Sequence, residues 1–213
     1  MTQIRYNMTV PSTTILGPGN RAVLWTQGCT RVPPCKGCIG ESARDPQGGK
    51  LESIERICQW ILSRPQIDGI TISGGEPFDQ AAAVAELVRM VRASRPDLSL
   101  VMYTGRYYEQ LLEQASSDPA TAELLSQIQV LIDGPYVAAL DDGVPYRGSS
   151  NQRILILDEA YRPQAQAYYT SQPGRKIELI VTPEGTRMVG VPSQAQAQSW
   201  HNLKRRISER EEK

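Results

Sequence analysis

Short apolar runs, most of them rich in Ile, Val and Leu, recur along the chain, and helical patterns separate the earlier ones. Most of these runs do not alternate cleanly with polar residues, which is typical of strands buried on both faces of a parallel sheet. Alternating strands and helices indicate βαβ units and an α/β fold. The predicted strands are Ala22–Thr26, Gly69–Ser73, Ser99–Tyr103, Val130–Asp133, Ile154–Leu157 and Ile177–Val181; the predicted helices are Leu51–Ser63, Asp79–Ala93 with Asp79 as N-cap, Tyr108–Ala115 and Ala120–Ile128.

The number of predicted strands limits the architecture. A chain of 213 residues is long enough for one domain with its own core. Its strands are too few for a complete eight-stranded barrel, so we expect a partial (βα)6-type barrel of mostly parallel strands or a doubly wound sheet. We expect a single domain over 1–192, a long loop over Asp141–Asn151, and a polar helix or tail over 193–213.

Charge and hydropathy exclude several classes of protein. The formal net charge is zero, whereas a protein that binds nucleic acid through phosphate contacts normally has a basic excess. The segment Met1–Val10 is polar, so we expect no signal peptide, and no apolar run approaches the roughly 18 residues of a membrane span. We therefore expect a cytoplasmic protein with reduced thiols, where clustered cysteines indicate metal binding or catalysis.

Three of the four cysteines lie close together. Cys29, Cys35 and Cys38 form C-x5-C-x2-C directly after a predicted strand, at the sheet edge where α/β active sites lie. Closed zinc sites use four protein ligands and disulfides use even numbers of cysteines. Thiolates also bind iron–sulfur clusters, and a cubane cluster with three protein ligands leaves one iron open.

Two other residues could complete a site with four protein ligands. His201 is the only histidine, and it could supply a remote fourth ligand to a zinc ion. Cys58 could be a fourth ligand of an iron–sulfur cluster, but it lies on the apolar stripe of the predicted helix Leu51–Ser63. This periodicity favours a buried structural thiol.

A second motif, Gly74-Gly75-Glu76-Pro77, follows the next predicted strand. Glycines let a backbone approach a ligand closely, Glu76 offers a carboxylate suited to an ammonium group, and Pro77 can open a helix. Taken alone, a motif of this length favours a tight strand-to-helix turn with an ordinary surface glutamate.

Together, the two motifs resemble the radical S-adenosylmethionine (SAM) superfamily. The segments around Cys29–Cys38 and Gly74–Pro77, with Val130–Tyr136, Arg147–Arg153 and Gly190–Pro192, resemble the branch that activates anaerobic ribonucleotide reductase, a glycyl-radical enzyme. The resemblance covers roughly residues 10–192 and implies a radical SAM core.

The resemblance also implies the chemistry. Cys29, Cys35 and Cys38 would bind a [4Fe–4S] cluster, whose open iron binds the amino and carboxylate groups of SAM. Reductive cleavage of SAM yields a 5′-deoxyadenosyl radical, which installs a glycyl radical on a large partner enzyme. A flavodoxin or ferredoxin-type protein would supply the electron. No nucleic acid and no membrane are implied as partners.

The implied SAM-binding residues come from several segments. Gly74, Gly75, Glu76 and Pro77 would contact SAM at its amino group, and Ile39 would supply an apolar contact to adenine. Asp133 would face the SAM pocket or a nearby cation, although a turn aspartate bonded to its own backbone explains it equally well. Ser150, Asn151 and Arg153 would contact SAM or line the exit of the radical, and Tyr103-Thr104-Gly105 would line the same pocket; plain turn or packing roles are alternatives.

Two features depart from the pattern of the superfamily. The usual spacing in the superfamily is C-x3-C-x2-C, so two additional residues within Arg31–Pro34 must bulge outward or reshape the exposed side of the cluster, where a partner would dock. Gly37 replaces the aromatic residue that often precedes the last cysteine, as in the reductase-activating branch. The spacing therefore bears on the identity of the partner more than on the cluster.

Two alternative functions remain at this point. One is a radical SAM enzyme that modifies a peptide or small metabolite, although Cys58 alone cannot provide a second cluster. The other is a non-catalytic zinc or iron–sulfur electron-transfer module, which would not need the Gly-Gly-Glu segment.

Overall fold

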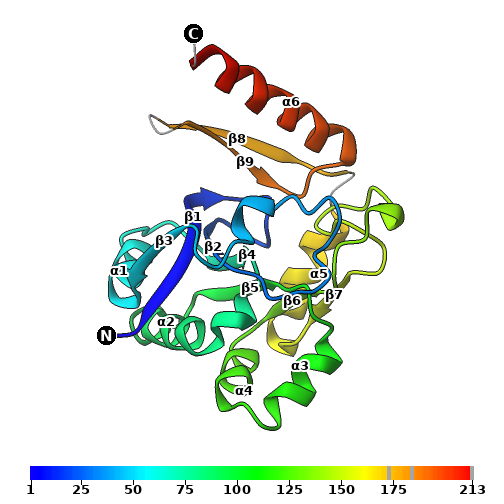
Figure 1. Cartoon of the computed structure of the whole chain (residues 1–213). Helices are drawn as coiled ribbons and strands as arrows, with labels where there is room; N and C mark the ends of the chain where they lie inside the picture. Colours follow the sequence, from blue (N-terminus) through cyan, green and yellow to red (C-terminus); the bar gives the residue numbers. More distant parts are fainter. Residues whose placement is uncertain (172–173, 183–184, 212–213) are drawn as a thin grey trace.

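The computed structural model describes residues 1–171, 174–182 and 185–211, and its centre is a seven-stranded mixed sheet (Figure 1). The strand order is β3-β1-β2-β4-β5-β6-β7, and β8 and β9 pair separately as an antiparallel hairpin. The strands are β1 (Gln3–Thr13), β2 (Arg21–Thr26), β3 (Lys50–Ser53), β4 (Gly69–Gly74), β5 (Ser99–Tyr103), β6 (Val130–Asp133), β7 (Arg153–Ile156), β8 (Ile177–Thr182) and β9 (Gly185–Gly190).

The helices lie between and after these strands. They are α1 (Ile54–Leu62), α2 (Ala81–Ser94), α3 (Tyr108–Ala115), α4 (Pro119–Ser126), α5 (Arg162–Thr170) and α6 (Gln194–Glu211), with short 3-10 turns at Glu41–Ala43, Pro77–Gln80, Ala138–Leu140 and Glu159–Tyr161. In the part of the chain that the structure describes, no helix combines the length and hydrophobicity of a membrane span.

The four central strands run parallel, as the apolar runs predict. β2 pairs with β4, β4 with β5, and β5 with β6, each in parallel register. Their carboxyl ends therefore meet at one edge, and the segments that follow β2 and β4 are the cysteine motif and the Gly-Gly-Glu motif. The predicted mixed α/β architecture with a largely parallel centre is confirmed.

The outer strands differ from the expected parallel arrangement. β7 runs antiparallel to β6, because the connection between them contains no helix that could carry the chain back across the sheet. β8 lies outside the main sheet and pairs with β9. The prediction omitted β1, β3 and β9; β3 has only four residues, and β1 is mostly half-buried and contains Pro11.

The two faces of the sheet bury different side chains. On β2, Ala22 and Leu24 face the core beneath α1–α4, whereas Val23 and Trp25 face the opposite side. Alternation of this kind follows from the pleat of a strand. The second face is covered by α5 and by the β8–β9 hairpin, whose Val189 packs with Val10 and Val23. This second face is the one that leads to the candidate site.

Arg21 lies fully buried at the start of β2 on this second face. Its guanidinium donates hydrogen bonds to the side chains of Thr71 and Ser99 and to the carbonyl oxygens of Pro18, Ile70 and Ser99. Burial lowers its pKa, and Tyr161 and Tyr169 lie close enough to act in the opposite direction. The start of β2 therefore buries a guanidinium whose hydrogen-bond donors have acceptors in the protein.

Candidate functional site

A cavity of about 210 Å³ opens at the carboxyl edge of the parallel strands. Its lining comes from three parts of the chain: the cysteine loop after β2, the turns after β4, β5 and β6, and the segment between β9 and α6. The side chains of Leu16, Trp25 and Tyr103 form part of its apolar wall. Polar groups at a strand edge over an apolar wall are typical of a ligand site.

All three clustered cysteines line this cavity. Cys29, Cys35 and Cys38 are free and partly buried, and they lie on the single loop that leaves β2. The N–H of Cys29 donates to the carbonyl of Arg44 at 3.1 Å, which fixes the start of the loop. Burial raises the pKa of Cys29 and of Cys38. A bound cation would stabilise the thiolate forms, since metal binding requires deprotonated thiols.

Asp79 holds the cysteine loop from the opposite side. Its carboxylate accepts hydrogen bonds from the N–H of Thr30 at 2.7 Å and from the Thr30 hydroxyl at 2.9 Å, and it pairs with Arg106. The predicted role of Asp79 as helix N-cap is wrong. A 3-10 turn over Pro77–Gln80 precedes α2, and Asp79 lies inside that turn with its carboxylate engaged by Thr30 and Arg106.

The Gly-Gly-Glu turn is tightly enclosed by backbone. Gly74 has φ +118°, a conformation that favours glycine, and a Cβ at Gly75 would lie 1.9 Å from the carbonyl oxygen of Gly28. The N–H of Glu76 donates to the same carbonyl at 2.8 Å. The two glycines therefore let the β4 turn pack against the start of the cysteine loop, and both line the cavity.

Glu76 is only 4% exposed and lines the cavity. It accepts hydrogen bonds from the N–H of Phe78, the hydroxyl of Thr104 and the N–H of Gly105. Burial raises its pKa, and the hydrogen bonds and Arg106 only partly offset this. An ammonium group in the cavity would favour the ionised carboxylate.

Ile39 lines the cavity and is 45% exposed. Pro77, in contrast, does not contribute to its lining: it is buried at the first position of the 3-10 turn. Thr104 and Gly105 line the cavity beside Glu76. Outside the cysteine loop, the ends of β4 and β5 therefore supply most of the residues that the sequence predicts for the site and that line the cavity.

The structure does not bring Asp133 to the cavity. Its buried carboxylate accepts hydrogen bonds from the N–H of Tyr108 and from the backbone N–H and guanidinium of Arg153. Asp133 therefore faces a nearby cation, the guanidinium of Arg153.

Ser150 and Asn151 also lie outside the cavity lining. Ser150 is exposed, and the amide of Asn151 donates to the carbonyl of Pro135 at 2.7 Å. The neighbouring Gly148 and Gln152 line the cavity instead. The loop therefore contributes to the cavity lining through Gly148 and Gln152 and not through Ser150 or Asn151.

Cys58 and His201 take no part in the cavity. Cys58 is buried in α1 among core residues, as its periodicity predicts, and His201 is exposed on α6. Among the described residues, no three His, Cys, Asp or Glu side chains converge tightly enough to hold a single metal ion. Three thiols spread along one loop fit a cluster, whose several irons bind ligands farther apart.

Several lining residues had no signal in the sequence. Arg31, Arg44 and Tyr136 reach the cavity from loops, and Ser193, Gln194 and Ala197 reach it from the start of α6. The guanidinium of Arg31 donates to the carbonyl of Gly105 at 3.2 Å, which links the cysteine loop to the end of β5. These contacts join segments far apart in sequence, so no local pattern could reveal them.

Comparisons with known proteins give a consistent result. A family model described as a 4Fe-4S single cluster domain matches residues 15–155. An anaerobic ribonucleoside-triphosphate reductase-activating protein of Vibrio cholerae is 32% identical over 158 residues, which cover 71% of this chain and 97% of that protein. Proteins of the same name from Enterobacteria phage T4 and Escherichia coli K12 are each 30% identical, over 71% of this chain and 93% and 97% of their own lengths.

Proposed function

This chain belongs to the 4Fe-4S single cluster domain family, together with anaerobic ribonucleoside-triphosphate reductase-activating proteins, and we propose that it is a radical SAM activating enzyme for a glycyl-radical reductase. The observation that carries the proposal is the convergence of two motifs. Cys29, Cys35 and Cys38 line the same cavity as Gly74, Gly75 and Glu76, and they come from neighbouring parallel strands.

In this proposal, Cys29, Cys35 and Cys38 ligate a [4Fe–4S] cluster. When bound and reduced by a flavodoxin or ferredoxin-type donor, the cluster supplies one electron to SAM, which splits into methionine and a 5′-deoxyadenosyl radical that takes a hydrogen atom from a partner glycine. The protein provides ligands, orientation and exclusion of water. The free state of the three thiols and their position on one cavity wall support this role.

Glu76 orients the ammonium group of SAM. Its carboxylate is fixed by three protein donors, so its position does not depend on the ligand. Burial raises the pKa of Glu76, and the positive charge of a bound ammonium group would stabilise its ionised carboxylate. The glycines beside it also line the cavity, and Ile39 offers an apolar surface for adenine.

The fold is consistent with a radical SAM core over 1–192. The parallel strands β2, β4, β5 and β6 form the centre of an open sheet, and the cavity lies at their carboxyl ends. A sheet of this kind would hold the cluster and SAM on the face that carries Trp25 and Tyr103.

The partner would approach along the cysteine loop. Val32 is 90% exposed within the bulge Arg31–Pro34, beside the mouth of the cavity. Pro33 and Pro34 are exposed beside it, so the segment presents adjacent apolar side chains that a partner protein would cover. The bulge carries the two residues that widen the cysteine spacing, and it would adapt the enzyme to its own reductase.

The test uses the anaerobically reconstituted protein with dithionite and SAM. We expect methionine and 5′-deoxyadenosine as products, and we expect Cys35→Ala to abolish both. Cys58→Ala is the matched control, since that buried thiol lies in α1 away from the cavity. If the protein binds iron but leaves SAM intact, every radical SAM function is excluded, including modification of a peptide or metabolite.

A second experiment addresses the open iron and the partner. SAM should change the EPR spectrum of the reduced cluster, whereas an unchanged spectrum would indicate four protein ligands. Addition of an anaerobic ribonucleoside-triphosphate reductase should then give a glycyl-radical doublet. Cleavage of SAM without that signal would favour a peptide or small-metabolite substrate.

A further inference from the structure

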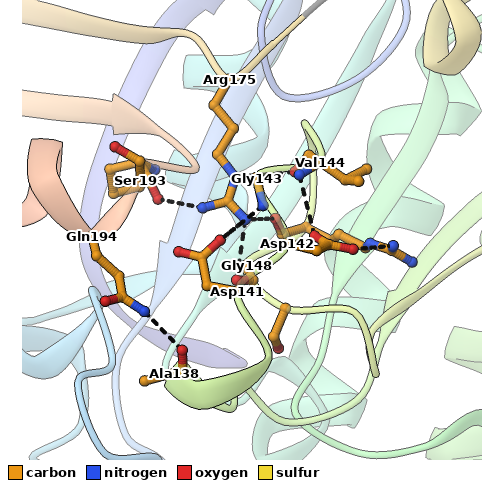
Figure 2. Close-up of polar contacts among 12 residues, drawn as sticks. Ala138, Asp141, Asp142, Gly143, Val144, Gly148, Arg175, Ser193 and Gln194 are labelled. Atoms are coloured by element: carbon orange, nitrogen blue, oxygen red, sulfur yellow. Dashed lines mark hydrogen bonds and ion pairs between the residues drawn. The ribbon is translucent and has the colours of Figure 1, made fainter.

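Arg175 joins two walls of the cavity, and it lies beyond the residues 15–155 that match the family model. Figure 2 shows its guanidinium reaching into the loop between Asp141 and Gly148. Its side chain is only 4% exposed, and its Nη2 lies 2.7 Å from a carboxylate oxygen of Asp141. A buried ion pair of this kind requires further hydrogen bonds to offset its desolvation.

Those hydrogen bonds go to two separate segments. Nε donates to the carbonyl of Val144 at 3.0 Å, and Nη2 donates to the carbonyls of Arg147 at 2.9 Å and Gly148 at 3.1 Å. Nη1 donates to the carbonyl of Pro192 at 3.1 Å, just before α6 begins. Only the planar fork of an arginine can hold both segments at once.

Both segments line the cavity. Gly148 lines it from the loop, and Pro192, Ser193 and Gln194 line it from the start of α6. The side-chain amide of Gln194 donates to the carbonyl of Ala138 at 2.7 Å, which adds a second link between the same walls (Figure 2). The far wall of the cavity is therefore assembled around Arg175.

Tyr136 connects this wall to the cysteine loop. A Cβ at Gly148 would lie 2.7 Å from the Tyr136 ring, so the ring packs directly on the backbone that Arg175 holds. On the other side, a Cβ at Gly37 would lie 3.7 Å from the same ring. Gly37 immediately precedes Cys38, and both line the cavity with Tyr136.

We infer that Arg175 is a positioning residue: through Gly148 and the Tyr136 ring, it sets the position of Gly37 and the adjacent thiol of Cys38. It touches neither the thiols nor the proposed SAM site, and its effect is transmitted by packed backbone and one aromatic ring. The part of the inference that concerns SAM rests on the proposed function.

The test compares Arg175→Gln and Gly148→Ala in the full chain. Gln removes the fork, and Ala at 148 displaces Tyr136 while leaving Arg175 in place. Both should speed backbone hydrogen exchange in the segments 136–150 and 35–38 before reconstitution. After reconstitution, both should weaken SAM binding by roughly tenfold, with a smaller effect on kcat, because small displacements of a binding geometry are costly.

Two further variants act as matched comparisons. Arg175→Lys keeps the charge opposite Asp141 but cannot donate to both segments, so its effects should be intermediate. Arg56→Gln removes an exposed arginine that pairs with Glu52, and it should change neither exchange nor SAM affinity.

The outcomes distinguish the inference about Arg175 from the proposed function. If Arg175→Gln lowers the melting temperature but leaves exchange at 35–38 at the wild-type rate, Arg175 has only a general structural role and the inference is overturned. If the wild type does not bind SAM, the proposed function fails, and the exchange data decide alone: faster exchange at 35–38 in both variants supports the inference, and an unchanged rate overturns it.

Discussion

The cysteine loop and the Gly-Gly-Glu turn are built in opposite ways. The turn over Gly74–Glu76 is enclosed by backbone and buried hydrogen bonds, with donors from three other positions fixing the Glu76 carboxylate. The loop over Cys29–Cys38 has partly exposed thiols and depends on anchors from elsewhere, including Arg44, Asp79 and Tyr136. From this difference we infer that the turn is ordered before any ligand binds, whereas the cysteine loop becomes fully ordered when a cluster binds.

The largest loss of stability should come from adding a methyl group at Gly75 in the Gly-Gly-Glu turn. Gly75→Ala would bring a methyl group within 1.9 Å of the Gly28 carbonyl, which is rigid backbone. We expect the free energy of unfolding of the cluster-free protein to fall by about 3 kcal/mol. Urea denaturation would measure this value.

Gly174→Ala is the matched control for this change. No atom lies within 4 Å of a Cβ at that position, and its φ is not in the left-handed region. We expect a change within about 0.5 kcal/mol. An equally small effect for Gly75→Ala would mean that the turn is not tightly enclosed.

A smaller effect should follow from loosening the anchor of the loop. Asp79→Asn removes the charge that pairs with Arg106 and weakens the two hydrogen bonds from Thr30. We expect a loss of about 1.5 kcal/mol of stability, since hydrogen bonds to charged groups have this magnitude. Faster hydrogen exchange at the Thr30 amide would locate the effect in the loop.

The exposed pair of Asp97 with Arg95 provides the comparison for Asp79. Asp97→Asn should leave the free energy of unfolding nearly unchanged, because surface ion pairs contribute little. Equal losses for the two variants would show that Asp79 is not a special anchor.

The pH dependence of stability should show the effect of burying the Glu76 carboxylate. Burial raises its folded-state pKa above the ordinary value, so its contribution to stability is present at low pH and is lost as pH rises through the folded pKa. Unfolding of the cluster-free wild type and of Glu76→Gln, measured from pH 4 to 8, should show a pH-dependent loss in the wild type that the variant lacks. Parallel curves for the two proteins would contradict the raised pKa.

The smallest effect on folding should come from the thiols. Cys35→Ala should change the unfolding free energy of the cluster-free protein by less than about 0.5 kcal/mol, because Cys35 is only partly buried. Its effect should appear in iron content, measured after reconstitution. A large loss of stability without the cluster would show that the loop is as tightly packed as the turn.

The parallel centre of the fold and the two principal motifs were accessible from the sequence, because their signals are local. Periodicity placed β5, β6 and α3 at their observed bounds, and spacing identified the thiols and the Gly-Gly-Glu turn. The antiparallel direction of β7 was missed because it depends on how the chain returns after β6, not on the strand itself.

The supporting residues of the site were not accessible in this way. Asp79 meets Thr30 across 49 positions, and Arg175 meets Val144 across 31. Asp133 was assigned two roles because a carboxylate at a strand end looks the same whether it faces a ligand or, as here, Arg153. Tertiary packing decides which partner each of these side chains contacts, and no local pattern in a single sequence shows that packing.

The buried Arg21 has a consequence for substitutions at the start of β2, the opposite end of that strand from the cysteines. Its guanidinium donates to Thr71 and Ile70 on β4 and to Ser99 on β5, so it joins three neighbouring strands at this end. Loss of the arginine would leave these acceptors buried without a donor, which costs more than the hydrogen bonds themselves contribute. The position is therefore intolerant of substitution, although Arg21 lies outside the cavity lining.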